Sequence, residues 1–355
     1  MPILAELVRV VIGVDTHKAT HTAAVLAAAT GGVLATQTVS TTPAGYQALL
    51  TLAQQHPGPR VWAVEGTGGY GAGLVRLLAE CGEGVVELDR PQRPTRRHGA
   101  KSDPLDAVRA AREALGRDRL AQPRAGGRRA ALGMLLAARR SAVDAATCAQ
   151  QQLQAMVVTA PEPLRARLRG RPTRQLITAC ARLRVHPSWE VERRPTTVVL
   201  RALARRVLEL ETEAHLHQQA ITSITRGWRP DLLAELGVGP ITAATVLAAW
   251  SHPGRCRSEA AFAMLGGAAP IPASSGQTIR HRLSRSGDRQ LTQALHTIVL
   301  TRLRRDPATQ AYAKRRRAQG NTDPEIKRCL VRDVARQPYR LLKAQPSTWR
   351  NLDGM

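Results

Sequence analysis

Hydrophobic residues in the first part of the chain form short apolar runs separated by turn residues. LVRVVIGVD at 7–15 is a β-branched run ending in an acid, and it predicts a buried strand. THTAAVLAAA and GVLATQTVS, separated by a turn at 30–32, predict two more strands of an antiparallel meander, while RVWAVEG and GVVELD predict a fourth and a fifth. Helical spacing at 42–55, with Thr42 as N-cap and Pro43 in the first turn, and at 69–82 predicts two helices. The expected order is βββαβαβ.

Beyond residue 90 the pattern turns helical. PQRPTRRHGAKSD predicts a surface loop before a helix that begins near Pro104. Residues 128–224 carry Ala, Leu, Arg and Gln at helical spacing, which predicts a long arm broken at 161–172 and 187–195. From Trp228 on, the pattern predicts a helix, a Gly-rich hairpin, two further helices with a turn-rich stretch after the second, and a final helical set. We therefore expect an α/β domain of RNase H-like order over 7–125, a helical or coiled-coil linker over 126–227, and a mainly α-helical domain over 228–345.

Charge is large and unevenly distributed. The 355 residues carry a formal net charge of +25, a balance that favours a polyanionic partner such as nucleic acid. Residues 1–90 hold 5 basic and 7 acidic side chains, whereas residues 276–345 hold 17 and 5. This asymmetry fits a metal site at the front and contacts to backbone phosphate at the rear. A GC-rich genome that favours Arg and Ala is the alternative explanation of the excess.

Composition excludes several other classes of protein. The 5 cysteines are scattered without zinc-ligand spacing, so we expect reduced thiols. The sequence has neither an apolar run long enough to span a membrane nor a secretory leader at its start. Aromatic residues make up only 3% of the chain, which disfavours base-stacking platforms. These features predict a cytoplasmic, nucleoid-associated prokaryotic protein with no membrane partner.

Acidic residues stand where the predicted elements bring them together. Asp15 ends the first strand and Glu65 the fourth, while Asp103 and Asp106 share one face at a helix start. Carboxylates from these elements suit divalent cations with oxygen ligands, so we expect a site for Mg²⁺ or Mn²⁺. The alternative is that each acid caps a turn or helix end. His17 follows Asp15, but a single histidine is more often a local hydrogen-bonding group than a ligand.

The rear of the chain offers a nucleophile. The loop PASSGQ holds Ser274 and Ser275 within an arginine-rich segment. Arginines that hold phosphate oxygens and lower the pKa of the hydroxyl would let a serine attack phosphate without a histidine partner. The alternative is a plain turn. The candidate arginines are Arg280, Arg282, Arg285 and Arg289.

Two further patterns predict contacts to nucleic acid. GVGPITAA, with Gly237 and Gly239, is typical of a helix-hairpin-helix element whose backbone amides approach a phosphate. A plain Gly-Pro helix hairpin is the alternative. RLRR at 302–305 and KRRR at 314–317, which includes Arg315 and Arg316, predict backbone-phosphate contacts or a solvated charged face.

In this order the motifs VIGVDTHK, VEGTGGY, AKSDPLDA, LGVGPITAATVLA, FAMLGGAAPIPASSGQ and SGDRQLTQAL resemble the DEDD insertion-sequence transposases, family one hundred and ten. The resemblance implies a RuvC-like front domain, a coiled-coil arm and a rear transposase domain. It assigns Asp15, Glu65, Asp103 and Asp106 to the metal-binding acids and Ser275 to the nucleophile, with Ser274 in reserve. It also implies that a structured bridge RNA selects the DNA sites and that the protein is a dimer or tetramer.

Three functions therefore remain open at this stage. The first is a transposase or site-specific recombinase that cleaves and rejoins the DNA of element ends and target. The second is a RuvC-type junction endonuclease in which water replaces the serine. The third is a non-catalytic nucleic-acid-binding derivative, which retention of all the acids disfavours.

Overall fold

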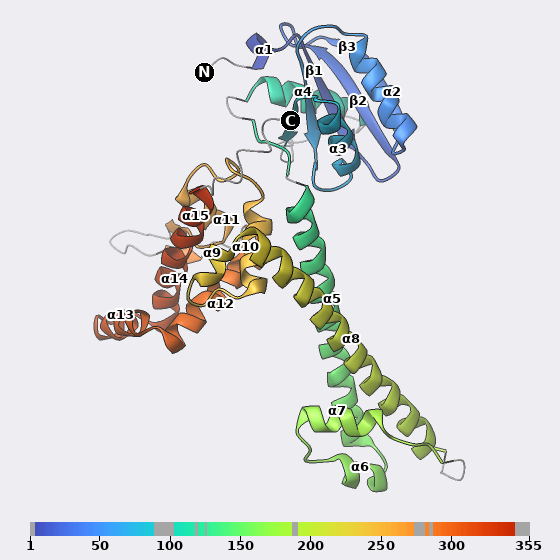
Figure 1. Ribbon diagram of the computed structural model, residues 1–355, viewed down its shortest axis with the longest axis vertical. Helices are drawn as coiled ribbons and strands as arrows, with labels where there is room; N and C mark the ends of the chain where they lie inside the picture. Colours follow the sequence, from blue (N-terminus) through green and yellow to red (C-terminus); the bar gives the residue numbers. More distant parts are fainter. Residues whose placement is uncertain are drawn as a thin grey trace. The chain divides into compact units, whose positions relative to one another are not determined.

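The computed structural model describes residues 4–88, 103–117, 120–124, 126–186, 191–272, 281–283 and 287–344 (Figure 1). The chain forms two compact units, which we call the front unit and the rear unit. The front unit comprises residues 1–130 together with 250–257, and the rear unit comprises residues 131–249 together with 258–355. A short stretch far along the chain thus belongs to the front unit.

A five-stranded mixed sheet forms the centre of the front unit. Its strand order is β3-β2-β1-β4-β5, with β1–β2 and β2–β3 antiparallel and β1–β4 and β4–β5 parallel. The predicted βββαβαβ order is confirmed, including Thr42, whose side chain accepts a hydrogen bond from Gly45 N. The strands are β1 (Val10–Thr16), β2 (Thr20–Ala27), β3 (Val33–Ser40), β4 (Arg60–Glu65) and β5 (Val85–Leu88), and the helices are α1 (Leu4–Leu7), α2 (Pro43–Gln54), α3 (Ala72–Glu80) and α4 (Asp103–Leu115).

Alternation along the strands gives the sheet two apolar faces. Val10, Ile12 and Val14 of β1 pack with residues of α2 and α3, whereas Val11 packs with residues of α4 on the opposite face. Because successive side chains of a strand point to opposite sides, one run of apolar residues supplies both cores. The front unit is therefore a three-layer α/β/α arrangement with α4 on one face.

Two long helices dominate the first part of the rear unit. The 33-residue α5 (Gly127–Thr159) and the 36-residue α8 (Arg193–Trp228) run side by side (Figure 1), and Arg139 of α5 donates hydrogen bonds to Gln218 of α8. Between them, α6 (Glu162–Leu168) lies inside the first predicted break, and α7 (Thr173–Ala181) follows it. A shared apolar cluster, including Leu153, Leu176 and Leu200, joins these helices. The predicted helical arm is confirmed. The segment 161–172, which was expected to interrupt it, itself contains the helix α6.

The rest of the rear unit is mainly helical, as predicted, except for a two-stranded antiparallel hairpin of β6 and β7 that the sequence pattern did not indicate. Within the described residues no helix is long and apolar enough to cross a membrane. The three-part division at 125 and 227 remains a prediction. The elements are α9 (Pro230–Ala234), α10 (Pro240–Trp250), α11 (Glu259–Leu265), β6 (Pro270–Pro272), β7 (His281–Leu283), α12 (Arg289–Arg305), α13 (Pro307–Ala318), α14 (Asp323–Val334) and α15 (Arg336–Lys343).

Candidate active site

The pairing of β1 with β4 brings two of the predicted acids to the same edge of the sheet. The two strands are parallel, with Val14 opposite Val64, so Asp15 and Glu65 occupy the next positions of neighbouring strands. The apolar run before each acid is buried, whereas both acids are half-buried where the strands reach the surface. This is the edge at which open α/β sheets usually place their functional groups.

Gly13 determines how closely α4 approaches β1. A Cβ atom at this position would lie 2.0 Å from the carbonyl oxygen of Ala107 and 2.6 Å from the backbone nitrogen of Ala111. Glycine on the strand and alanines on the helix therefore let the two backbones nearly touch. Because Asp103 and Asp106 form the first turn of α4, this close contact brings both acids toward the end of β1.

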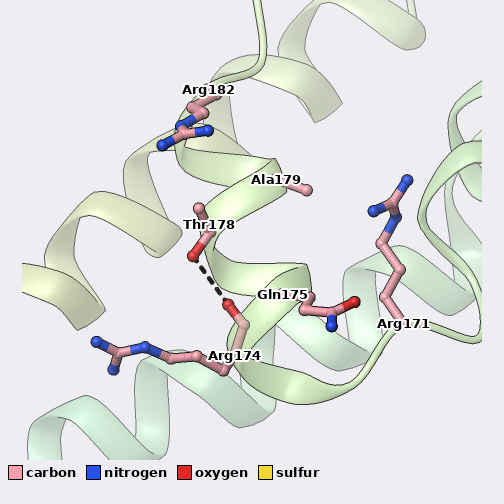
Figure 2. Close-up of a pocket in the computed structure, with 6 residues that line it drawn as sticks. All are labelled: Arg171, Arg174, Gln175, Thr178, Ala179 and Arg182. Carbon is pink, nitrogen blue, oxygen red and sulfur yellow. Dashed lines mark hydrogen bonds between the residues drawn. The ribbon is translucent and has the colours of Figure 1, made fainter.

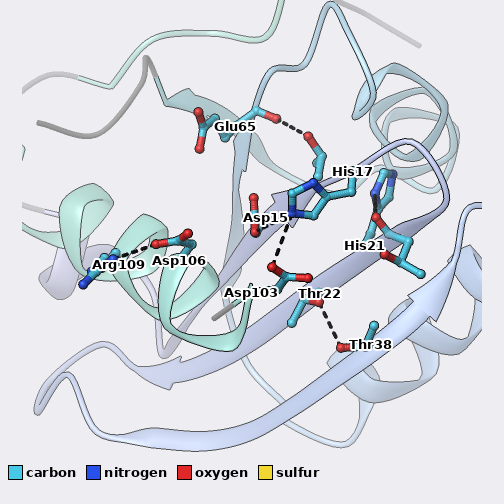
Figure 3. A network of polar contacts seen from close by, with 11 residues as sticks. Asp15, His17, His21, Thr22, Thr38, Glu65, Asp103, Asp106 and Arg109 are labelled. Atoms are coloured by element: carbon cyan, nitrogen blue, oxygen red, sulfur yellow. Dashed lines mark hydrogen bonds and ion pairs between the residues drawn. The ribbon is translucent and has the colours of Figure 1, made fainter. Parts of the chain in front are cut away.

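His17 joins two of the acids (Figure 3). Its Nε2 atom lies 3.2 Å from Asp15 Oδ2 and 3.5 Å from Asp103 Oδ1. One potential ligand atom from each of these residues lies within 4.8 Å of the other two. His17 was expected to be a local hydrogen-bonding group rather than a ligand, and its contacts reach from β1 to the first turn of α4. The signal available in the sequence was its position directly beyond the strand end.

Asp106 and Glu65 lie outside this closest set. Asp106 Oδ1 accepts a hydrogen bond of 2.7 Å from Arg109 Nη1, one helical turn away. The backbone oxygen of Glu65 accepts a hydrogen bond of 3.0 Å from Thr16 Oγ1, which holds the ends of β1 and β4 together. Figure 3 shows the four carboxylates arising from β1, β4 and α4 at one end of the sheet. The predicted convergence of the elements is therefore seen, although Asp15, His17 and Asp103 form the tightest group.

Electrostatics at Asp15 suit a cation. Burial raises the pKa of Asp15 above its ordinary value; the neighbouring His17 opposes this shift, and the charges of Asp106 and Asp103 add to it. Asp15 Oδ2 is buried, and its contact with His17 Nε2 at 3.2 Å is an ion pair rather than a well-aligned hydrogen bond. A divalent cation would give this oxygen a stronger partner and offset the repulsion among the carboxylates. Carboxylate oxygens and an imidazole nitrogen fit Mn²⁺ well, and the carboxylates alone fit Mg²⁺.

Residues of β2 next to the site make contacts of their own within the front unit. Thr22, which pairs with Asp15, shares a hydrogen bond of 2.9 Å with Thr38 of β3. His21 is fully buried and stacks on Tyr46 at a centroid distance of 5.6 Å. Burial lowers the pKa of His21, so it is neutral near pH 7.

Several of the predicted rear-domain residues lie outside the described part of the chain. These are Ser274, Ser275, Arg280 and Arg285, while Arg282 is described only as a backbone position in β7. Arg289 is the exposed first residue of α12, directly after Asp288, whose carboxylate caps the helix by accepting hydrogen bonds from Gln290 N and Leu291 N. The roles given to these residues remain predictions.

The two glycines of the GVGP motif differ in their surroundings. Gly237 has a φ of +86°, and a Cβ atom there would lie 3.1 Å from the carbonyl oxygen of Ile298 in α12. Backbone conformation and packing alone therefore explain why glycine occupies this position. Gly239 has open space around its Cβ position and precedes α10. Of the two, Gly239 is the more exposed, and its conformation and packing do not require glycine.

The basic run on α13 is partly occupied by contacts within the protein. The Arg315 guanidinium lies over the Tyr312 ring at 5.5 Å. Arg316 donates hydrogen bonds of 3.0 Å to the side-chain oxygens of Gln319 and Asn321. Arg316 therefore helps to end α13, whereas Arg315 remains exposed and its charge uncompensated by a carboxylate in the described residues.

An acidic cluster at the end of an α/β sheet, followed by a mainly helical region, is an arrangement that metal-dependent enzymes acting on nucleic acid can have. Comparison with known proteins identifies the family. A family model for DEDD transposases of the IS110 type matches residues 12–160, and a second, described as the transposase IS116/IS110/IS902 family, matches residues 232–314. The chain belongs to the IS110 family of insertion-sequence transposases.

One curated relative is an uncharacterized 43.6 kDa protein of the insertion element IS110 from Streptomyces coelicolor. It is 33% identical over 141 residues, which make up 39% of this chain and 32% of the relative. The similarity thus covers about a third of that protein. Family membership rests mainly on the two family models, which match separate segments at the front and the rear.

Proposed function

We propose that the protein is a DNA transposase that cleaves and rejoins DNA, with the acidic cluster as its metal site and Ser275 as its nucleophile. The observation that carries the proposal is the convergence of Asp15, His17 and Asp103 at the end of β1, in a chain of a transposase family. Asp106 and Glu65 complete the proposed acidic set from the same end of the sheet.

The acids and the metal would share one task. Asp15, Asp103, Asp106 and Glu65 would hold Mg²⁺ or Mn²⁺, which when bound would supply positive charge to stabilise the phosphate oxygens in the transition state. Asp15 is held in place by the sheet and Asp103 by the close packing of α4 against Gly13. His17 bridges the two carboxylates and keeps their separation short.

The serine would provide covalent catalysis. The Ser275 oxygen forms a bond to phosphorus as the bond between phosphorus and one DNA strand breaks; that strand leaves with the electron pair and takes up a proton, while the serine hydroxyl gives one up. A hydroxyl of the incoming strand then displaces the serine, so the number of phosphodiester bonds is conserved. Arg280, Arg282, Arg285 and Arg289 would hold the phosphate oxygens.

The partners follow from the same assignment. Element ends and target are the DNA substrates, a structured guide RNA pairs with them to select the site, and a dimer or tetramer supplies the strands to be exchanged. The strongly positive net charge of +25 supports a nucleic-acid partner.

The test uses the full chain with labelled element-end DNA, co-expressed RNA and Mg²⁺, resolved on a denaturing gel. We expect a protease-sensitive protein–DNA adduct that is lost in Ser275→Ala and kept in Ser274→Ala. Asp15→Asn should slow strand cleavage by about 10²-fold or more, while Asp144→Asn, an exposed acid on α5, should leave the rate unchanged.

Other outcomes point to the remaining functions. Nicked DNA without an adduct, dependent on Asp15 and indifferent to Ser275, would establish a water-using junction endonuclease instead. Binding of DNA and RNA without any cleavage, in a preparation that holds Mn²⁺ at the acidic site, would establish a non-catalytic derivative.

A further inference from the structure

A second basic feature, separate from the residues discussed so far, lies on α7 between the two long helices. A shallow hollow of about 350 Å³ is lined by Arg171, Arg174, Gln175, Thr178, Ala179 and Arg182 (Figure 2). Arg174, Gln175, Thr178 and Ala179 share one face of α7, and Leu176, Ile177 and Cys180 are buried on the other. Arg171 comes just before the helix and Arg182 is its C-cap residue. We call this surface the arginine hollow. It follows the nine-residue α7, which is roughly 13 Å long.

The hollow carries more positive charge than its surroundings neutralise. Residues 162–184 contain seven arginines but a single acid, Glu162. Glu162 pairs with Arg165 and lies 3.7 Å from Arg169, and Arg174 pairs with Glu211 of α8. Within the described residues no carboxylate pairs with Arg171 or Arg182.

Two arginines of α8 bring further positive charge to the C-terminal end of α7. At the end of α7, Arg201 and Arg205 of α8 donate hydrogen bonds to the carbonyl oxygens of Leu183 and Ala181, at 3.3 and 3.4 Å. Of the two, Arg205 acts on the last residue of α7 and so compensates the negative end of the helix dipole. The Arg182 side chain makes no hydrogen bond or ion pair with another described residue, so it is available to another partner.

The lining chemistry selects the class of partner. A protein-binding surface needs an apolar or aromatic centre, yet Ala179 is the one apolar residue that lines the hollow. Guanidinium groups match the oxygens of phosphates in a planar, bidentate geometry. Thr178 is engaged with the carbonyl oxygen of Arg174 at 3.0 Å, whereas the Gln175 amide makes no hydrogen bond to another described residue and is exposed. Arginines and an amide donor arranged along a shallow groove fit a sugar-phosphate backbone.

We propose that the arginine hollow binds the sugar-phosphate backbone of a nucleic acid through Arg171, Arg174 and Arg182, with Gln175 as a neutral donor. This inference rests on the proposed function for one point, that the partner is a nucleic acid. Neither the acidic site nor Ser275 takes part in it. It gives the helical arm a binding role in addition to that of a spacer.

The test compares two charge-matched variants of the full chain. The hollow variant carries Arg171→Gln, Arg174→Gln and Arg182→Gln, and the control variant carries Arg140→Gln, Arg206→Gln and Arg226→Gln, exposed arginines of α5 and α8 that do not line the hollow. Affinity is measured by fluorescence anisotropy between 0.05 and 0.3 M salt, roughly the range in which counterion release dominates. The probes are a DNA duplex, an RNA hairpin and polyglutamate, and circular dichroism checks the fold of each variant.

We expect the hollow variant to bind at least one nucleic-acid probe about tenfold or more weakly at 0.1 M salt, and its salt slope to fall by about 2 to 3. The control variant should lose less than half as much. A loss confined to the RNA hairpin assigns the hollow to RNA, and a loss confined to the duplex assigns it to DNA. The wild-type affinity and slope in the hollow variant with both probes, or an equal loss in the control variant, would overturn the proposal. Loss of polyglutamate binding alone would overturn it in favour of an acidic protein.

Failure of the proposed function would look different. Unchanged strand cleavage in Asp15→Asn and Ser275→Ala would refute the proposed chemistry. The difference in nucleic-acid affinity between the hollow and control variants would still be expected. Conversely, unchanged nucleic-acid affinity in the hollow variant would refute only the binding role proposed for the arginine hollow.

Discussion

Replacing Gly13 by alanine tests how the acidic site is assembled. The added methyl group would lie 2.0 Å from the oxygen of Ala107, 2.6 Å from the nitrogen of Ala111 and 3.0 Å from its Cβ. Two of these three atoms belong to the backbone of α4, so a change of rotamer cannot relieve the contacts. The helix must move away from β1 by roughly 1 Å or more to restore ordinary contact distances.

The expected cost follows from this displacement. Overpacking a close contact typically costs about 1 to 3 kcal/mol and occasionally more, and the contact with backbone places Gly13→Ala at the upper end of that range. For a unit of this size the melting temperature should fall by roughly 5 to 15 °C. The first turn of α4 moves with the helix, so Mn²⁺ affinity should fall about tenfold or more, as expected when metal ligands lose their support.

Two measurements on the full chain check this expectation: thermal unfolding followed by circular dichroism, and Mn²⁺ titration by calorimetry. Gly133→Ala is the matched control, because Gly133 lies within α5 and a Cβ there meets no atom within 4 Å. The same chemical change should stabilise that helix by about 0.5 to 1 kcal/mol and leave Mn²⁺ binding unaltered. A Gly13→Ala protein with the stability and Mn²⁺ affinity of the wild type would refute the proposed closeness of α4 to β1.

Two further predictions concern stability. The hydrogen bonds from Arg60, and to a lesser degree from Trp62, hold the pKa of Glu83 below its ordinary value of 4.5 despite burial. The ionised Glu83 therefore stabilises the fold above pH 4.5, and this stabilisation is lost as the pH falls through the lower pKa of the folded state. Glu83→Gln should accordingly flatten the dependence of melting temperature on pH in that acid range. In the rear unit, Arg229 is 3% exposed, pairs with Asp231 and donates to the carbonyl oxygen of Leu341 at 2.7 Å. Arg229→Met should lower the free energy of unfolding by about 2 to 4 kcal/mol in urea titrations, and a change below 0.5 kcal/mol, roughly that of an ordinary surface substitution, would contradict the role given to this residue.

Local patterns in the sequence were sufficient to predict most of the helices and strands. The β-branched runs that become β1 to β5 and the N-cap at Thr42 depend on neighbouring residues alone, so their expected positions agree with the structure. The β6–β7 hairpin was missed because Pro270 and Pro272 occupy β6, and proline lacks the amide hydrogen that a ladder requires.

The geometry of the candidate site could be predicted only in part. The acids could be placed at strand and helix ends, but the distance between β1 and α4 depends on the pairing of Gly13 with Ala107 and Ala111, nearly a hundred residues away. That long-range contact also brings His17 to Asp103, so the role of this histidine could not be read from its immediate neighbours. A glycine inside an otherwise β-branched strand was the available signal.

The return of residues 250–257 to the front unit has a consequence for synthesis on the ribosome. All acids of the proposed site have been made by residue 106, yet residues 131–249 must be translated before the returning segment follows. At typical elongation rates this takes roughly 6 to 24 seconds. During that interval the nascent front unit lacks buried residues such as His252 and Cys256, so its last stage of folding waits for most of the arm to be translated. A chain truncated after α4 would contain every proposed metal ligand and still lack the segment that completes their unit.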